Sequence, residues 1–258
     1  MTRLEGPLAD PQSGLWIAGR LAQAGTVSGT VPEGFEAYAR IFHPIHAQLM
    51  GWQQDGPATV DSRTMRWQEL AEVRGAVPHP LMQWASILAG YRNPVSNEPG
   101  WQYEDPLVGS MPSGTLAEVV RILGAHTPAP ERCTAGLWDG YGWVTGSVQA
   151  AFIDAGGTAA RLQLPLRGYL LFQADLSVFA GRGWQERNGW DPLQSPNLLW
   201  PADAAWFLAT EIDLDSTLVG GPAALIADLV ESRTIEALQV PADGDVTALG
   251  DTVNEAPD

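Results

Sequence analysis

Apolar residues recur at helical spacing in four stretches of the chain, and these stretches predict four amphipathic helices. The helices are expected at residues 64–74, 80–89, 115–124 and 222–232. The third begins with Thr115-Leu-Ala-Glu118, which is typical of a capping box, where each of the two side chains satisfies a backbone N–H group of the first turn. Glycine or proline flanks every one of these stretches, so each helix has an expected boundary.

Shorter apolar or alternating runs between glycine and proline predict β-strands, most of them in the second half of the chain. These strands are expected at residues 15–17, 35–43, 134–144, 160–164, 168–172, 206–218 and 235–240. The intervals rich in glycine, proline and polar residues are expected to be loops, at 25–34, 91–114 and 181–197. Because helices group in the middle and strands follow, the sequence predicts an α+β fold: a mixed or antiparallel sheet with flanking helices.

The chain shows no linker that would divide it, so residues 1–240 are expected to form a single α+β domain. The composition changes after residue 240, where aspartate, glycine, alanine, threonine and proline dominate. Such a composition is typical of a solvated segment. Residues 241–258 are therefore predicted to be an acidic, disordered tail.

The 258-residue chain carries a formal net charge of −16, and this charge is concentrated toward its end. Residues 203–258 hold 12 acidic side chains against Arg233 alone. A field of this sign repels phosphate backbones and anionic lipids, so neither nucleic acid nor a membrane is an expected partner. The charge instead favours solubility, or the approach of cations or of a basic protein surface.

The residue types that are rare or absent exclude several kinds of chemistry. Lysine is absent, which excludes Schiff-base catalysis and a phosphate-binding Walker lysine. Cys133 is the single cysteine, so an intramolecular disulfide framework is excluded, and a half-buried thiol is expected. The four histidines are expected to be structural or at the surface. No apolar run approaches the roughly 18 residues of a membrane span, and a cytoplasmic location is expected.

The run Asp213-Leu-Asp215-Ser-Thr-Leu follows a strand-like stretch and resembles the first motif of the haloacid dehalogenase phosphatases. The resemblance implies that Asp213 is a nucleophile and that Asp215 is a general acid–base whose backbone helps to hold Mg²⁺. Only one helix and a tail are expected after this run, whereas that family places further motifs downstream. The resemblance supplies the alternative function, a Mg²⁺-dependent hydrolase or phosphatase that uses the Asp213-x-Asp215 pair.

The same acidic residues permit a second interpretation. Glu211, Asp213 and Asp215 alternate along a predicted strand, so their side chains are expected to share one face of a sheet. Unpaired carboxylates in a row repel one another and require a cation, an arginine or water nearby. They predict either a hard-cation site for Mg²⁺ or Ca²⁺ or a solvated face paired with Arg161 or Arg167. No other cofactor is predicted.

The chain contains 11 tryptophans, an unusual number. Some, such as Trp67 and Trp206, lie at core-like positions, whereas others lie in glycine-rich or polar surroundings. Exposed aromatic side chains can stack on uncharged ligands or anchor a protein partner. Together with nearby polar residues they define a candidate binding surface, which consists of Trp138, Tyr141, Trp143, Arg167, Tyr169, Asp203, Glu211, Asp213 and Asp215.

The run SPNLLWPADAAW that begins at Ser195 resembles an uncharacterised actinobacterial protein family with no assigned function. The LWDGYG run from Leu137 and the LPLRGY run from Leu164 belong to the same pattern. The resemblance extends over most of the chain and agrees with the use of arginine in place of lysine. It implies no catalytic residue.

These observations predict a non-catalytic binding or protein-interaction domain with an acidic, tryptophan-rich surface. Its partner is expected to be a protein or an uncharged small molecule. One form of this hypothesis is an immunity-type protein that neutralises a basic partner, because opposite charges speed association. The alternative is the Mg²⁺-dependent hydrolase described above.

Overall fold

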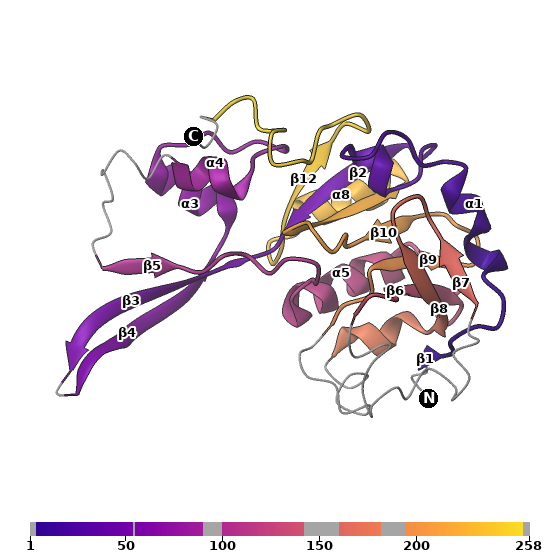
Figure 1. The fold of residues 1–258 in the computed structure, drawn as a ribbon, viewed down its shortest axis with the longest axis horizontal. Helices are drawn as coiled ribbons and strands as arrows, with labels where there is room; N and C mark the ends of the chain where they lie inside the picture. Colours follow the sequence, from indigo (N-terminus) through magenta and orange to yellow (C-terminus); the bar gives the residue numbers. More distant parts are fainter. Residues whose placement is uncertain (1–3, 54, 90–99, 142–159, 182–193, 255–258) are drawn as a thin grey trace.

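The computed structural model describes residues 4–53, 55–89, 100–141, 160–181 and 194–254. They form two sheets with helices packed beside them (Figure 1). Every strand pairing in these ranges is antiparallel, and the fold is α+β, as predicted. Among these residues, no helix is both long enough and apolar enough to cross a membrane.

The described residues place nine strands in the main sheet, and their bounds are β1 (Leu4–Glu5), β2 (Ala37–Phe42), β6 (Cys133–Trp138), β7 (Arg161–Gln163), β8 (Gly168–Ala174), β9 (Leu198–Pro201), β10 (Phe207–Ala209), β11 (Ser216–Gly221) and β12 (Glu236–Val240). Their order across the sheet is β1-β8-β6-β9-β10-β11-β2-β12, and β7 also pairs with β8. The first strands along the chain therefore lie at or near opposite edges of the sheet. The central strands are buried on both faces, which explains their nearly continuous apolar sequence.

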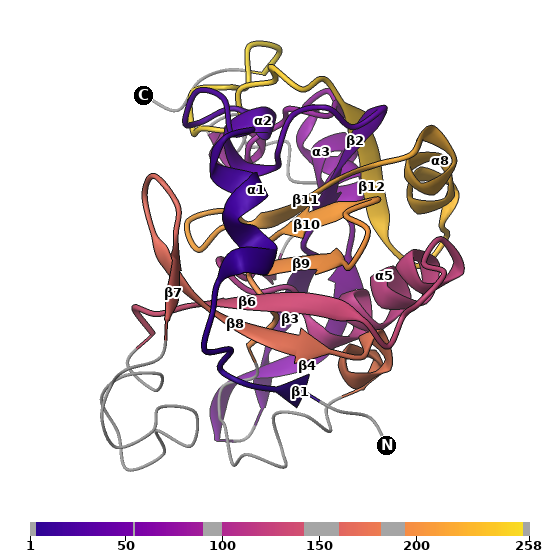
Figure 2. The same ribbon diagram turned by 90° about the vertical axis from the view of Figure 1, so that its right-hand side faces the viewer.

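Alternate residues of the central strands pack into two hydrophobic cores on opposite faces of the sheet. In β8, Leu170 and Phe172 belong to one core, whereas Tyr169 and Leu171 belong to the other. Two longer helices cover the first face and two short ones the second (Figure 2). The covering helices are α5 (Ser113–Ala125) and α8 (Ala223–Glu231) on the first face, and α1 (Leu15–Ala18) and α2 (Val27–Thr30) on the second.

All four predicted helices are present, with boundaries shifted by up to four residues. The remaining two are α3 (Trp67–Arg74) and α4 (Trp84–Ala89). The predicted capping box is wrong, because α5 begins at Ser113 with Pro112 at its N-cap position. Thr115 therefore lies buried within the first turn. Glu118 pairs with Arg121 instead, at 2.8 Å between Oε1 and Nη2.

Three strand predictions and two loop predictions are also corrected. The strand predicted at 134–144 ends at Trp138, where a turn begins, and the loop predicted at 91–114 contains a strand at residues 101–103. Residues 15–17 lie in helix α1, because a three-residue apolar run fits a short helix as well as a strand. The strand predicted at residues 206–218 is instead two strands, β10 and β11, joined by a turn at residues 210–215. The predicted loop at 25–34 contains α2, whose N-cap residue Thr26 accepts a hydrogen bond from a backbone N–H group at 3.1 Å.

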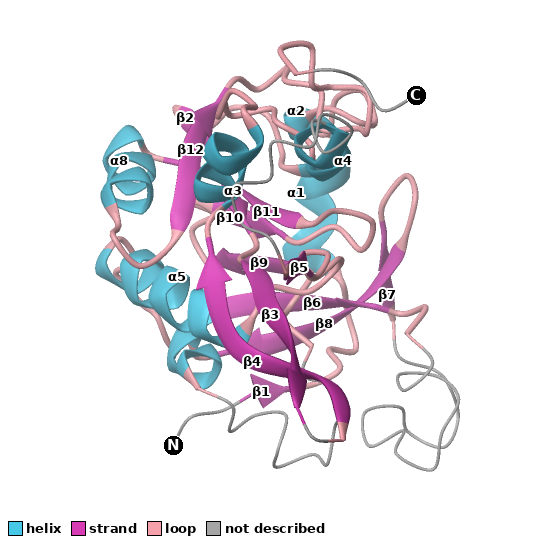
Figure 3. Ribbon diagram, turned by 90° about the vertical axis from the view of Figure 1, so that its left-hand side faces the viewer, coloured by secondary structure: helices cyan, strands magenta, loops and turns pink. Residues whose placement is uncertain are grey.

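A three-stranded sheet projects from the rest of the molecule, as Figure 1 and Figure 3 show. It contains β3 (Ile45–Gln53), β4 (Gly56–Met65) and β5 (Trp101–Tyr103), in the order β4-β3-β5. The sequence did not predict the β3–β4 hairpin, because most of its side chains face solvent and show no apolar alternation. Its base packs with α3 and α4 around Trp67, which is fully buried.

The segment after β12 is not the predicted disordered tail. Over residues 241–254 it packs beside α2, where two N–H groups of that helix donate to the carbonyls of Ala242 and Gly244 at 2.8 and 2.9 Å. Val246 is buried in the second core. Backbone hydrogen bonds and one apolar anchor thus hold a segment whose composition is polar. We call residues 241–254 the C-terminal strap; residues 255–258 lie outside the described ranges.

Candidate functional site

Five parts of the chain surround a cavity of about 490 Å³, which we call the main cavity. They are α2 with the loop before it, the start of α4, the β7–β8 turn, the β10–β11 turn and the C-terminal strap. Figure 2 shows the β7–β8 and β10–β11 turns projecting on the same side of the sheet. The residues that line this cavity are Ala24, Gly25, Gly29, Thr30, Gln83, Trp84, Ala85, Leu166, Arg167, Glu211, Asp213, Leu214, Asp215, Val246, Thr247 and Ala248.

A smaller cavity of about 140 Å³ adjoins the main cavity and shares part of its wall, including Arg167 and Glu211. Its remaining lining is largely apolar and includes Tyr169, Leu198 and Ala209 from the second face of the main sheet. The two cavities together provide an apolar interior beside a charged wall.

Arg167, in the β7–β8 turn, organises that charged wall. Its Nε donates to Glu211 Oε1 at 2.6 Å, and its Nη2 donates to Asp213 Oδ2. Its guanidinium carbon also lies 5.6 Å from the centroid of the Trp138 ring, which packs edge-on against Tyr141 at 5.1 Å. The predicted pairing with Arg167 is confirmed for Glu211 and Asp213 but not for Asp215, and Arg161 pairs with Asp139 instead, at 2.7 Å. Two neighbouring turns are thereby joined through charge-assisted hydrogen bonds.

The three acidic residues do not form the predicted row on one strand face. Glu211, Asp213 and Asp215 lie in the tight β10–β11 turn, where the N–H of Leu214 donates to the carbonyl of Glu211 at 3.0 Å. The turn directs the first two side chains to Arg167 and the third elsewhere. Among the residues that the structure describes, no group of three or more histidine, cysteine or acidic side chains is placed to hold a metal ion.

Asp215 instead faces Arg40, a fully buried arginine in β2. The distance from Arg40 Nη2 to Asp215 Oδ1 is 3.5 Å. Stronger contacts hold the rest of the guanidinium: Nε donates to Ser216 Oγ at 2.8 Å and Nη1 donates to the Met82 carbonyl at 2.9 Å. Burial lowers the pKa of Arg40 to about 10 and raises the pKa of Asp215. In both groups desolvation therefore outweighs the attraction between the partners.

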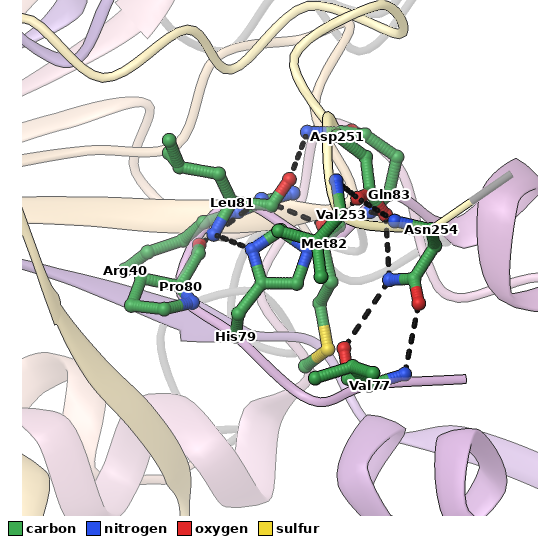
Figure 4. Close-up of polar contacts among 10 residues, drawn as sticks. All are labelled: Arg40, Val77, His79, Pro80, Leu81, Met82, Gln83, Asp251, Val253 and Asn254. Atoms are coloured by element: carbon green, nitrogen blue, oxygen red, sulfur yellow. Dashed lines mark hydrogen bonds and ion pairs between the residues drawn. The ribbon is translucent and has the colours of Figure 1, made fainter. Parts of the chain in front are cut away.

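The C-terminal strap is held in place by Asp251, whose side chain is fully buried and is drawn with its hydrogen-bond partners in Figure 4. Its Oδ1 accepts from His79 Nε2 at 2.8 Å, and its Oδ2 accepts from the Gln83 N–H at 3.1 Å. Asn254 donates both its backbone N–H and its side-chain amide to the same carboxylate. Burial alone would raise the pKa of Asp251, but these hydrogen bonds outweigh it and hold the pKa at about 2. The strap and the start of α4 are thus fixed together as one wall of the main cavity.

The structure brings together most of the candidate binding surface. Arg167, Tyr169 and the three acidic residues of the β10–β11 turn line one or both cavities. Trp138 and Tyr141 line neither, but they adjoin the site because Arg167 lies over the Trp138 ring, against which Tyr141 packs. Asp203 does not join them, because it follows β9 at the opposite end of β10 and accepts a hydrogen bond from the Ala205 N–H. Trp143 lies outside the described residues.

The sequence did not identify several residues that complete the site. Gln83 and Trp84 come from the start of α4, and the strap adds Val246, Thr247 and Ala248. Each lies far along the chain from Arg167, so no local spacing joins them. One signal was available: Arg40 is a charged residue in the middle of a predicted strand, and such a position demands a buried partner.

The remaining titratable candidates have structural roles. His43 is fully buried; its Nδ1 lies 2.5 Å from the Leu107 carbonyl and its Nε2 lies 3.0 Å from Thr217 Oγ1. Because a carbonyl only accepts, Nδ1 carries the proton and Nε2 accepts from the Thr217 hydroxyl. Burial lowers the pKa of His43 to about 4. Cys133 is also buried, and desolvation raises its pKa to about 12, so the thiolate does not form near neutrality.

Comparison of this chain with protein-family models, with curated proteins and with solved structures found no match.

Proposed function

We propose that this protein is a non-catalytic binding domain and that the main cavity holds its ligand, a small organic molecule. The main support for the proposal is the size and the lining of this cavity. At about 490 Å³ it falls within the range of small-molecule sites, and apolar side chains such as Leu166, Leu214 and Val246 line much of it. A few polar groups converge on this apolar surface, which is the usual arrangement in a ligand site.

The contacts of the acidic residues favour binding over hydrolysis. A metal-dependent hydrolase built on Asp213-x-Asp215 requires both carboxylates on one metal ion and one phosphoryl group. Here Asp213 is paired with Arg167 and Asp215 with Arg40, in different directions. Catalysis through this pair would first require both ion pairs to break.

The shape of the site also favours a small molecule over a protein partner. A concave site formed by five chain segments encloses a compact ligand, whereas a protein partner requires an extended surface of about 800 Å². A basic partner protein, as in the immunity-type hypothesis, remains an outcome that the experiment below detects.

The test is a screen of small organic fragments by thermal unfolding, followed by calorimetric titration. A ligand present at about 100 times its Kd stabilises the protein by about 2.7 kcal/mol, which for a chain of this size raises Tm by about 5–10 °C. Ala248→Trp, which adds bulk at the cavity wall, should abolish binding. Leu249→Trp is the matched control, because Leu249 is adjacent but highly exposed and outside the lining.

Binding that is lost in Ala248→Trp and retained in Leu249→Trp supports the proposal. A screen in which no ligand depends on Ala248, together with salt-sensitive capture of a basic protein, would replace the small molecule with a protein partner.

A further inference from the structure

We infer that the main cavity selects an organic cation, a molecule with a protonated amine on an apolar body. This inference rests on the proposed function and adds the chemical class of the ligand. It follows from three features of the cavity wall: its charges, the hydrogen-bonding groups it leaves open, and the apolar surface beside them.

The first feature is the balance of charges. Among the residues that the structure describes, three carboxylates line the cavity, from Glu211, Asp213 and Asp215, against one arginine, Arg167. Arg40 lies behind Asp215 and does not line the cavity. In a partly enclosed space this excess of negative charge attracts a cation more strongly than in open solvent, because the effective dielectric constant is lower.

The second feature is that Arg167 is already engaged while its partners are not fully used. Both of its donors described above are directed at carboxylates, so an anionic ligand would have to displace Glu211 or Asp213. Within the described part of the chain, side-chain and backbone donors reach only Oε1 of Glu211 and Oδ2 of Asp213. The second oxygen of each carboxylate is available to an ammonium group, which is a donor at every hydrogen.

Asp215 adds a third acceptor at the cavity. Its pair with Arg40 is long, at 3.5 Å, whereas Arg40 makes closer hydrogen bonds to Ser216 and Met82. The Asp215 side chain keeps 19% of its surface exposed. Its charge is therefore incompletely neutralised from within the protein and lies at the wall of the cavity.

The third feature is an apolar surface for the body of the ligand, to which Leu166, Leu214 and Val246 contribute. Trp84 also lines the cavity, and its position is fixed because its indole N–H donates to Asp105 Oδ1 at 2.7 Å and its ring packs on Trp67 at 5.6 Å. Carboxylates beside apolar side chains are suited to an amine attached to an apolar group.

The test uses three probes that share a phenyl ring and a short chain and differ in charge near neutral pH: 2-phenylethylamine, 2-phenylethanol and 3-phenylpropionate. Calorimetric titration should give the amine a Kd at least about tenfold lower than that of the alcohol, and no measurable binding of the propionate. Ala248→Trp should remove the amine signal.

Asp213→Asn tests the charge requirement in a variant expected to fold normally, because the Asp213 side chain is 73% exposed. It should raise the Kd of the amine about threefold, and the double variant Asp213→Asn/Glu211→Gln about tenfold or more. Asp61→Asn, on the exposed strand β4, makes the same change in net charge away from the cavity and should leave the Kd unchanged.

Three results would overturn the inference. If the alcohol or the propionate binds at least as tightly as the amine and Ala248→Trp blocks it, the cavity is a ligand site for a different class, and the proposed function stands. If the amine binds equally well to Ala248→Trp, or is weakened equally by Asp61→Asn, it is attracted only by the general negative charge. If none of the three probes binds while other fragments bind in a way that depends on Ala248, the ligand is not an organic cation, although the main cavity is still the ligand site.

Discussion

Replacing Asp251 with alanine removes the carboxylate that holds the C-terminal strap against the start of α4. The buried N–H of Gln83 then loses its acceptor, which costs about 1–3 kcal/mol. Hydrogen bonds from His79 and Asn254 to a charged acceptor are lost as well, although these donors lie nearer the surface and regain water. We expect the free energy of unfolding to fall by about 3–4 kcal/mol in total and Tm to fall by about 10 °C.

The pH dependence of this loss follows from the pKa of Asp251. Its folded pKa of about 2 lies below the unfolded value of about 3.9, so the carboxylate stabilises the fold above about pH 4. That contribution, roughly 2.5 kcal/mol, declines as the pH falls toward the folded pKa. The difference in unfolding free energy between the native chain and Asp251→Ala should therefore narrow by about 1 kcal/mol between about pH 6 and about pH 3.

Urea unfolding followed by circular dichroism measures both quantities, with Asp243→Ala as the control. Asp243 is an exposed acid of the same strap, so its replacement changes the net charge equally without removing the tie. The role of Asp251 would be refuted if Asp251→Ala lowered the free energy of unfolding by less than about 1 kcal/mol, or by no more than the control does. It would also be refuted if the difference in unfolding free energy between the native chain and Asp251→Ala stayed constant as the pH falls.

Three further predictions concern other parts of the fold. Arg40→Met should lower the free energy of unfolding by about 3–5 kcal/mol in urea, because the largely buried Asp215 carboxylate loses its cationic partner. Arg161→Met, at a partly exposed ion pair, should lower it by less than about 1 kcal/mol. Gly109→Ala should lower Tm and weaken ligand binding, because Gly109 has a φ of +74° and an added Cβ would lie 2.7 Å from a carbonyl oxygen of the β10–β11 turn; normal stability would contradict this. Cys133 should react with iodoacetamide only after denaturation, since it is buried and its pKa is raised to about 12; rapid labelling of the native protein, followed by mass spectrometry, would contradict its assigned environment.

The elements that the sequence predicts correctly are those whose apolar side chains follow a regular pattern and are buried in the fold. Helix α8 is predicted because it buries a periodic set of side chains against the main sheet, and strand β8 is predicted because it is buried on both faces and is therefore a nearly continuous apolar run. The β3–β4 hairpin is not predicted, because its faces are largely solvated; Trp52, at its end, is 84% exposed. The turn that separates β10 from β11 was hidden by the alternation of Glu211, Asp213 and Asp215, which fits an extended strand as well as a turn.

The candidate site was predictable only where its residues belong to a local pattern. The alternate spacing of the acidic residues in the β10–β11 turn identified them as candidate site residues, and Arg167 was predicted as a partner for them. The wall formed by Gln83, Trp84 and Val246 was not, since tertiary packing alone brings these segments together. The strap was wrongly predicted to be disordered because its composition is polar. Its order depends largely on backbone hydrogen bonds and on the carboxylate of Asp251, and amino-acid composition indicates neither.

The contact between α2 and the C-terminal strap has a consequence for how the main cavity forms. The carbonyl of Ala242 accepts from the N–H of Ser28, so the main cavity is enclosed by segments from both ends of the described chain. During synthesis the cavity cannot close until the strap has left the ribosome. A nascent or proteolytically shortened chain can thus complete much of its sheet while lacking one wall of the pocket. A ligand in that pocket would in turn hold the two ends together and protect the strap from proteases.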